Sequence, residues 1–156
     1  MSQPRQEWMA LLARSPLPLL ESALEAHRPQ QPQWLRRPET GLMMVQGRAG
    51  GQGERFNLGE ITVTRCALRL HADHSQPVGV AYVLGRNHRQ AWLAAVADAL
   101  LQDPARHAEL SQALLAPIRA HLAMQEAERQ QRTQDTRVDF LTLAREVAGL
   151  EDEVTA

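Results

Sequence analysis

The chain has 156 residues, in which all 17 basic side chains are arginine, 18 side chains are acidic and Cys66 is the only cysteine. Without lysine, the chain cannot form a lysine Schiff base or hold a nucleotide phosphate with a P-loop lysine. A single cysteine excludes an iron–sulfur cluster, a cysteine-rich zinc site and an intrachain disulfide within this chain. The longest apolar run, residues 91–97, is far short of the roughly 20 residues that span a membrane. The N-terminus also lacks a secretory h-region, so we expect a cytoplasmic protein.

The charges are distributed unevenly along the chain. Residues 41–90 hold six arginines against three acids, whereas residues 91–156 hold six arginines against eleven acids. The same positive segment contains eight of the nine glycines. Because glycine loops and arginines both serve anion binding, residues 41–90 are the segment most suited to an anion-binding site.

The apolar spacing predicts two short helices within residues 4–27. The first covers residues 4–13, and the second has Ser15 as its N-cap and Pro16 at its first position. Residues 28–38 contain three prolines, so we expect a connection there with at most a brief strand inside it. The two helices form a predicted N-terminal helical hairpin.

The middle of the chain has the composition of β-strands. Three runs rich in β-branched or alternating apolar residues predict strands, at residues 42–48, 60–70 and 78–86. Residues 50–59 are too rich in glycine for regular structure and predict a loop. Consecutive strands joined by loops indicate an antiparallel meander, which we place within residues 33–86.

From residue 88 onward the pattern is helical. Residues 88–102 are apolar on nearly all sides, which is typical of a buried helix, and Asp98 is the lone acid in it. Further helices follow to residue 124. Residues 125–137 contain no large hydrophobe, and the amphipathic segment after them is either a helix that folds back or one that docks on a partner. The proposed docking residues are Phe140, Leu141, Leu143 and Val147.

These elements predict an α+β fold. We expect a single domain in which an antiparallel meander of three to four strands packs against helices, with an N-terminal helical hairpin and a C-terminal helical arm. The domain covers residues 1–124, with helices at 4–27 and 88–124. Residues 125–156 are expected to form the polar spacer and the C-terminal docking helix.

The strongest local signal for binding is the glycine–arginine segment (residues 46–56). Its glycines allow backbone N–H groups to converge on an anion, and its arginines can supply bidentate contacts. It is neither a P-loop nor a dinucleotide motif, because lysine is missing and a strand follows instead of a helix. The alternative is a tight inter-strand loop whose arginines pair with Glu54, Glu60 or the acids of a partner. The candidate phosphate-binding residues are Arg48, Gly50, Gly51, Gly53, Arg55, Arg65 and Arg86.

Other candidate sites are weaker. His71 and His74 flank a turn without further metal ligands, so we expect no metal site. Cys66 lies in a strand and is expected to be a small buried side chain rather than a nucleophile. Asp98 is expected to be a hydrogen-bonded or arginine-paired core carboxylate, with a catalytic base as the alternative. No complete catalytic set is evident, and we assign no catalytic residue.

Several stretches in order along the chain resemble the PhnG family, a subunit of the bacterial carbon–phosphorus lyase core complex. They are Trp8-Met9, residues 39–42, 47–53, 56–66, 82–86 and 98–102, and Arg137 to Phe140. The resemblance implies assembly with PhnH, PhnI and PhnJ. It also implies that, with PhnH, PhnI and PhnL, the chain takes part in the attack of a phosphonate on the anomeric carbon of ATP. Adenine leaves, and methylphosphonate gives ribose 1-methylphosphonate 5-triphosphate.

The family resemblance implies no cofactor in this chain, with ATP and the phosphonate as substrates of the complex. Two interpretations of the glycine–arginine segment remain open. It holds the phosphonate or triphosphate at a subunit boundary, or it is a purely structural interface and the chain is a scaffold; we favour the scaffold. Nucleic-acid binding is disfavoured, because the charge is balanced and no long basic stripe is present.

Overall fold

A computed structural model describes residues 5–71 and 76–135 of the chain. Its secondary-structure elements, in chain order, are α1 (Arg5–Arg14), α2 (Leu17–Ala23), a 3-10 turn (Glu25–His27), β1 (Gln33–Arg48), a second 3-10 turn (Ala49–Gly51), β2 (Arg55–Arg69), β3 (Gly79–Leu84), α3 (His88–Leu101), α4 (Pro104–Leu110), a π-helical turn (Ser111–Leu115) and α5 (Ala116–Asp135). The α+β prediction is confirmed. No helix in the described part of the chain is long and apolar enough to cross a membrane.

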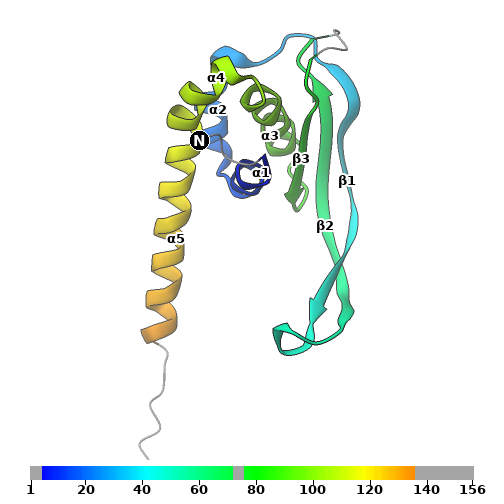
Figure 1. Ribbon diagram of the computed structural model, residues 1–156, viewed down its shortest axis with the longest axis vertical. Coiled ribbons are helices and arrows are strands. Elements are labelled where there is room, and N and C mark those ends of the chain that lie inside the picture. Colours follow the sequence, from blue (N-terminus) through cyan, green and yellow to red (C-terminus); the bar gives the residue numbers. More distant parts are fainter. Residues whose placement is uncertain (1–4, 72–75, 136–156) are drawn as a thin grey trace, which may run out of the picture.

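The sheet is an antiparallel meander of three strands in the order β1-β2-β3. Helix α3 packs on one face of it, with α1 beside β3, and α4 and α5 form a further layer on the far side of these helices (Figure 1). The meander prediction is therefore correct, with three strands among the described residues.

Helix α3 is the centre of the hydrophobic core. Ten of its residues are buried, as expected for a helix that is apolar all round. It lies so close to β3 that a Cβ atom added to Gly79 would be 2.0 Å from the carbonyl oxygen of Ala95. The core side of β3 is formed by Gly79, Ala81 and Val83, which are buried. Small side chains on this strand therefore set the distance between helix and sheet.

Three local predictions are wrong. Ser15 does not cap α2: its hydroxyl donates to the carbonyl oxygen of Leu12 instead, at 2.9 Å, and Pro16 is the N-cap. The proline-rich connection is largely the first half of β1, which begins at Gln33 and absorbs its internal proline at a register shift between Arg36 and Glu39. An edge strand tolerates proline because one side of its backbone has no partner.

The glycine-rich loop is also shorter than predicted. β2 already begins at Arg55, so residues 55–59 belong to a strand and only residues 49–54 form the turn. The turn has two glycines with left-handed backbone, Gly50 at φ 57° and Gly51 at φ 78°. Their positive φ angles explain why glycine is required there.

Two parts of the molecule extend beyond the body in the same direction. One is the end of the β1–β2 hairpin and the other is the C-terminal half of α5 (Figure 1). β3 pairs only with residues 63–68 of β2, so the hairpin beyond them is a two-stranded ribbon, here called the ribbon (residues 42–62). Residues 125–135, predicted to be a polar spacer, form the last turns of α5. The division of the chain at residue 125 stays a prediction.

Candidate functional site

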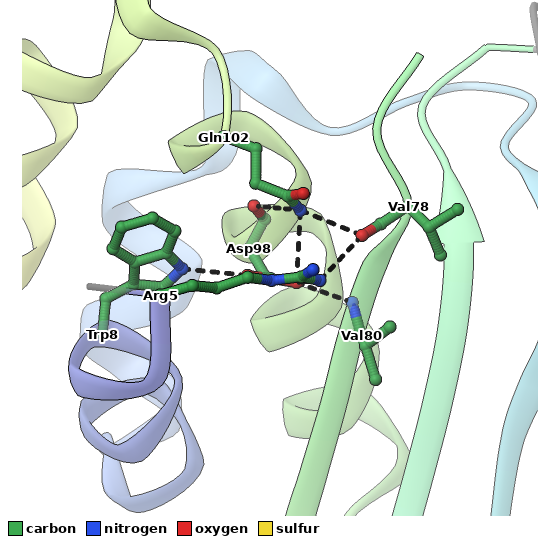
Figure 2. Close-up of polar contacts among 6 residues, drawn as sticks. All are labelled: Arg5, Trp8, Val78, Val80, Asp98 and Gln102. Atoms are coloured by element: carbon green, nitrogen blue, oxygen red, sulfur yellow. Dashed lines mark hydrogen bonds and ion pairs between the residues drawn. The ribbon is translucent and has the colours of Figure 1, made fainter. Parts of the chain in front are cut away.

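A buried carboxylate joins α1, α3 and β3. Asp98 of α3 is fully buried, and its Oδ1 accepts hydrogen bonds from the indole N–H of Trp8 at 2.9 Å and from Nε of Arg5 at 3.1 Å. Its Oδ2 accepts from Nη2 of Arg5 at 2.6 Å and from the backbone N–H of Val80 at 2.9 Å. Gln102 donates to Oδ2 at 3.4 Å (Figure 2). We call these residues the Asp98 network.

The Asp98 network also supplies hydrogen-bond partners at the start of the free edge of β3. The carbonyl oxygen of Val78 accepts from Arg5 and from Gln102, both at 2.9 Å, and the N–H of Val80 is bonded to Asp98. Hydrogen bonds to Asp98 raise the pKa of Arg5 above its ordinary value. The interpretation of Asp98 as an arginine-paired core carboxylate is confirmed, because both of its oxygens are occupied by donors.

Two of the predicted phosphate-binding arginines meet at the tip of the ribbon. Arg48 and Arg55 are direct cross-strand partners, and like charges in that position repel each other unless an anion lies between them. With Gln46 and Gly47 they line a shallow cleft of about 390 Å³. Arg48 donates to the carbonyl oxygen of Gly53 at 3.3 Å, which holds its side chain over the turn.

The glycine backbone of the turn contributes less than its sequence suggests. Gly50 and Gly51 supply the reversal of the chain, but the N–H of Gly53 already donates to the carbonyl oxygen of Ala49 at 2.9 Å. That N–H group is therefore not available to an anion in this conformation. Any anion at the tip would depend mainly on the two arginine side chains.

The other two arginines lie elsewhere. Arg65 is ten residues from Arg55 along β2, which corresponds to about 33 Å at the rise of a strand, and it pairs with Glu39 at 2.9 Å. Arg86 follows Gly85, whose N–H donates to the carbonyl oxygen of Thr62, about 23 Å from Arg55 by the same measure. The seven candidate residues therefore do not form one site.

Arg65 is one of two arginines that share a single carboxylate. Glu39 accepts from Arg36 and from Arg65, and these hydrogen bonds, that from Arg36 first, lower the pKa of Glu39. Arg65 thus already has an acidic partner within the sheet, which it shares with Arg36. That partner is Glu39 and not Glu54 or Glu60, which the alternative named.

The ribbon exposes several large apolar side chains to solvent. Leu42 is 65% exposed and Leu58 is 63% exposed, and further exposed hydrophobic side chains are Met43, Met44 and Phe56 on the ribbon and Tyr82 and Leu84 on β3. Because neighbouring residues in a strand point to opposite faces, the run from Leu42 to Met44 makes both faces apolar. Contiguous exposed apolar surface of this kind is typical of sites that contact another protein, a membrane or a ligand.

The cover that α3 gives to the sheet ends where the ribbon begins. The hydroxyl of Thr40 is 2.9 Å from Nε2 of His88, the first residue of α3, and 3.2 Å from the hydroxyl of Thr64. Beyond this polar contact neither strand is buried at any position between residues 42 and 62. The apolar side chains of the ribbon therefore have no cover among the described residues.

The remaining candidates are Cys66, the metal site and the residues outside the described ranges. Cys66 is buried, and burial raises the pKa of its thiol to about 12, so it is not a nucleophile at neutral pH. No group of three or more histidine, cysteine or acidic residues in the described ranges could hold a metal ion. His74 and the docking residues Phe140, Leu141, Leu143 and Val147 lie outside the described residues.

Sequence reasoning missed the partners of Asp98 and a cleft next to them. A lone acid in an apolar helix signals a buried cation, but nothing in the sequence selects Arg5, which is 93 residues away. The cleft is lined by residues of α1, α3, α4, the π-helical turn and α5, among them Arg5, His107 and Arg119. These residues come together only in the tertiary structure.

The fold and its surface define a small α+β chain whose β1–β2 ribbon exposes large apolar side chains. The model of the family "Phosphonate metabolism protein PhnG" matches residues 3–146, so the chain belongs to the PhnG family. A curated relative from Rhizobium meliloti (strain 1021) is 42% identical over 143 residues, which cover 90% of this chain and 88% of the relative. Its name is alpha-D-ribose 1-methylphosphonate 5-triphosphate synthase subunit PhnG.

Proposed function

We propose that this chain is a subunit of a ribose 1-methylphosphonate 5-triphosphate synthase and that its main contribution is to dock on, and complete, another subunit. The observation that carries the proposal is the ribbon, whose two faces expose large apolar side chains such as Leu42 and Leu58. The family membership and the name of the relative support the synthase.

The partners that we propose are PhnH, PhnI and PhnL for the synthase step, with PhnJ in the same core complex. The complex would act as a transferase: an oxygen of the phosphonate attacks the anomeric carbon of ATP, the bond from that carbon to adenine breaks, and adenine leaves with a proton. ATP and the phosphonate are then substrates of the complex, and this chain carries no cofactor. We expect little or no activity from the chain alone.

A second role is substrate contact at the tip of the ribbon. The directly opposed pair Arg48 and Arg55 favours it, because two guanidinium groups across a ladder suit an oxyanion. The phosphonate or the triphosphate would then be held where the ribbon meets a partner. The alternative is a purely structural subunit without substrate contact. The two roles predict different effects of losing Arg48 and Arg55: turnover falls if the tip contacts substrate, and it is unchanged if the subunit is purely structural.

The test uses the complex reconstituted with PhnH, PhnI, PhnJ and PhnL, with co-purification and adenine release from ATP plus methylphosphonate as readouts. The variant Leu42→Ser/Leu58→Ser removes two exposed apolar side chains, each worth about 1.5–3 kcal/mol when buried, so capture should fall at least tenfold. Met124→Ser on α5, where Met124 is also exposed at 58%, is the matched control. Undiminished assembly of the double variant would refute docking through the ribbon.

In the same assay, Arg48→Gln/Arg55→Gln distinguishes the two roles. Assembly with slower adenine release supports substrate contact, and normal turnover supports the structural role. Deletion of residues 136–156, the predicted docking arm, should release PhnI or PhnJ; an intact complex after this deletion counts against the arm but leaves the ribbon untouched.

A further inference from the structure

The two outer edges of the sheet have different surroundings. At the edge of β3, the carbonyl oxygen of Val78 and the N–H of Val80 have side-chain partners, which are Arg5, Gln102 and Asp98. β1 is the other edge strand, because its backbone pairs only with β2. Figure 1 shows β1 on the outer side of the sheet, with no described helix or strand beyond it. Within the described residues, the outer edge of β1 has no hydrogen-bond partner.

The register of the sheet identifies the backbone groups on this free edge. The N–H of Gly85 donates to the carbonyl oxygen of Thr62, so the backbone groups of Thr62 point toward β3. Since successive residues of a strand direct these groups to opposite sides, those of Ile61 point toward β1, where its partner is Met43. The register shift nearer the tip places its extra residue, Leu58, in β2 and leaves the alternation of β1 unchanged. The residues of β1 that direct N–H and C=O groups away from the sheet are therefore Thr40, Leu42, Met44, Gln46 and Arg48.

The two halves of this edge differ in their protection against pairing. Native edge strands prevent unwanted pairing with proline, charged side chains and bulges. The first half of β1 has all three, since it contains Arg36, Arg37 and Pro38 and its register shifts there. Residues 40–47 contain neither proline nor a charged side chain. The second half of the edge therefore has the properties of a surface to which another strand can be added.

Positive charge without an acidic partner lies at the end of this open edge. Arg48 donates to the carbonyl oxygen of Gly53, and no described carboxylate forms an ion pair with Arg48 or with its cross-strand partner Arg55. The cleft that the two arginines line contains no acidic side chain among its described residues. An incoming strand with an aspartate or glutamate at this end would pair with both guanidinium groups.

A second copy of the chain cannot supply this acid from its own β1. Glu39 is the only acidic residue of β1, and its carboxylate already accepts from Arg36 and Arg65. When two copies of one strand pair antiparallel about a two-fold axis, opposed residues lie on the same face. Because faces alternate along the strand, an even-numbered residue then lies opposite an even-numbered one, and Arg48 never lies opposite Glu39. The charge therefore favours a different protein as the occupant of the edge.

We propose that the free edge of residues 40–48 pairs with an extended strand of another protein, which adds a fourth strand to the sheet and places an acidic side chain at Arg48 and Arg55. In such strand addition, main-chain hydrogen bonds supply affinity and alternate side chains supply specificity. The inference rests on the proposed docking function and specifies its mode, which is backbone pairing at an edge rather than side-chain contact alone.

The first test separates backbone pairing from side-chain contact, in the complex reconstituted with PhnH, PhnI, PhnJ and PhnL. Met44→Pro removes an outward N–H that has no partner among the described residues, and Met44→Ala keeps this N–H but removes the same side chain. We expect Met44→Pro to bind the other subunits about tenfold more weakly than Met44→Ala, because an acceptor of the added strand is left unpaired. Equal binding of the two variants overturns the strand pairing. The proposed function is then still decided by the Leu42→Ser/Leu58→Ser variant.

Hydrogen–deuterium exchange tests the same pairing in the unmodified chain, where no proline can distort the ribbon. In the free full-length chain, β2 should protect the N–H groups of Met43 and Val45, whereas those of Leu42 and Met44 should exchange quickly. In the complex, the exchange of Leu42 and Met44 should slow about tenfold or more. Unchanged exchange in the complex would overturn the proposal. Slow exchange already in the free chain would also overturn it, because residues 136–156 or a second copy would then cover the edge.

Charge reversal at the tip tests the acidic residue of the added strand. Arg48→Glu should weaken binding to the other subunits about tenfold, while adenine release at saturating subunit concentrations stays normal. Arg37→Glu is the matched control, because Arg37 is an exposed arginine in the protected half of the same strand. Equal weakening by the control, or a loss of turnover at saturation by Arg48→Glu, would overturn the pairing of Arg48 with an acid of the partner strand.

Discussion

Asp98 is a residue whose surroundings decide its role. Carboxylates act as general bases when an oxygen can reach a substrate proton, but both oxygens of Asp98 accept hydrogen bonds from protein donors. The network ties the first helix to the central helix and to the edge strand. Its contribution is therefore to stability, and its loss should be visible in unfolding rather than in chemistry.

We expect Asp98→Asn to lower the free energy of unfolding by about 2–4 kcal/mol. The new amide would turn an N–H₂ group toward donors of Arg5, Val80 or Trp8, so at least one of them loses its acceptor. Urea unfolding measures the effect. Asp103→Asn is the control, since Asp103 caps α4 through the N–H of Ala105 and asparagine caps equally well. Equal stability of both variants would contradict a structural role for Asp98.

The pairing of a buried acid could be predicted from sequence, but its geometry could not. A lone aspartate in an apolar helix must find donors to be buried at all, and the structure bears this out. The choice of Arg5 among 17 arginines depends on where α1 packs. For the same reason Arg48 and Arg55 meet across a hairpin, while Arg65 and Arg86 lie far from them. Each residue along an extended strand adds about 3.3 Å, so a separation of ten residues in one strand is a long distance in space.

At the scale of elements, the packing of β3 on α3 depends on one glycine. A Cβ atom at Gly79 would lie 2.0 Å from the carbonyl oxygen of Ala95 and 2.8 Å from Cβ of Ala99. Both obstacles are parts of a buried helix, which cannot move aside as a flexible side chain would. Helix and strand would have to separate.

Gly79→Ala should therefore destabilise the fold by at least the ~1–3 kcal/mol that is usual for overpacking. Gly41→Ala is the matched control, because no atom lies within 4 Å of a Cβ built at Gly41. Thermal unfolding of the two variants, followed by circular dichroism, should show a lower midpoint for Gly79→Ala and little change for Gly41→Ala. A similar midpoint for both would mean that β3 and α3 are not in rigid contact.

Elements with a strong period were predictable, whereas those shaped by tertiary context were not. Helix α3 and the core face of β3 follow directly from their apolar patterns. The first half of β1 could not be predicted in this way, because Pro38 and the neighbouring charges argue against a strand unless it is an edge strand. That β1 is an edge strand depends on the strand order, which no local pattern reveals. The early start of β2 likewise depends on pairing with β1 across the glycine turn.

At the scale of the whole molecule, stability and the proposed docking function reside in different parts. The buried side chains belong to α1, α2, the body of the sheet, α3 and the helices after it, and none of residues 44–60 is buried. The body can therefore keep its core when the ribbon is removed. This separation gives a direct way to distinguish loss of folding from loss of assembly.

Replacing residues 44–60 with Asn-Gly joins Met43 to Ile61, which are direct cross-strand partners, through the two-residue turn that suits such a hairpin. The shortened chain should unfold cooperatively with a midpoint within a few degrees of the full chain, because no core contact is lost. It should no longer be retained by the synthase subunits. A non-cooperative transition would show that the ribbon stabilises the body, and undiminished retention would move the docking surface to another face, with the C-terminal half of α5 the next to be tested.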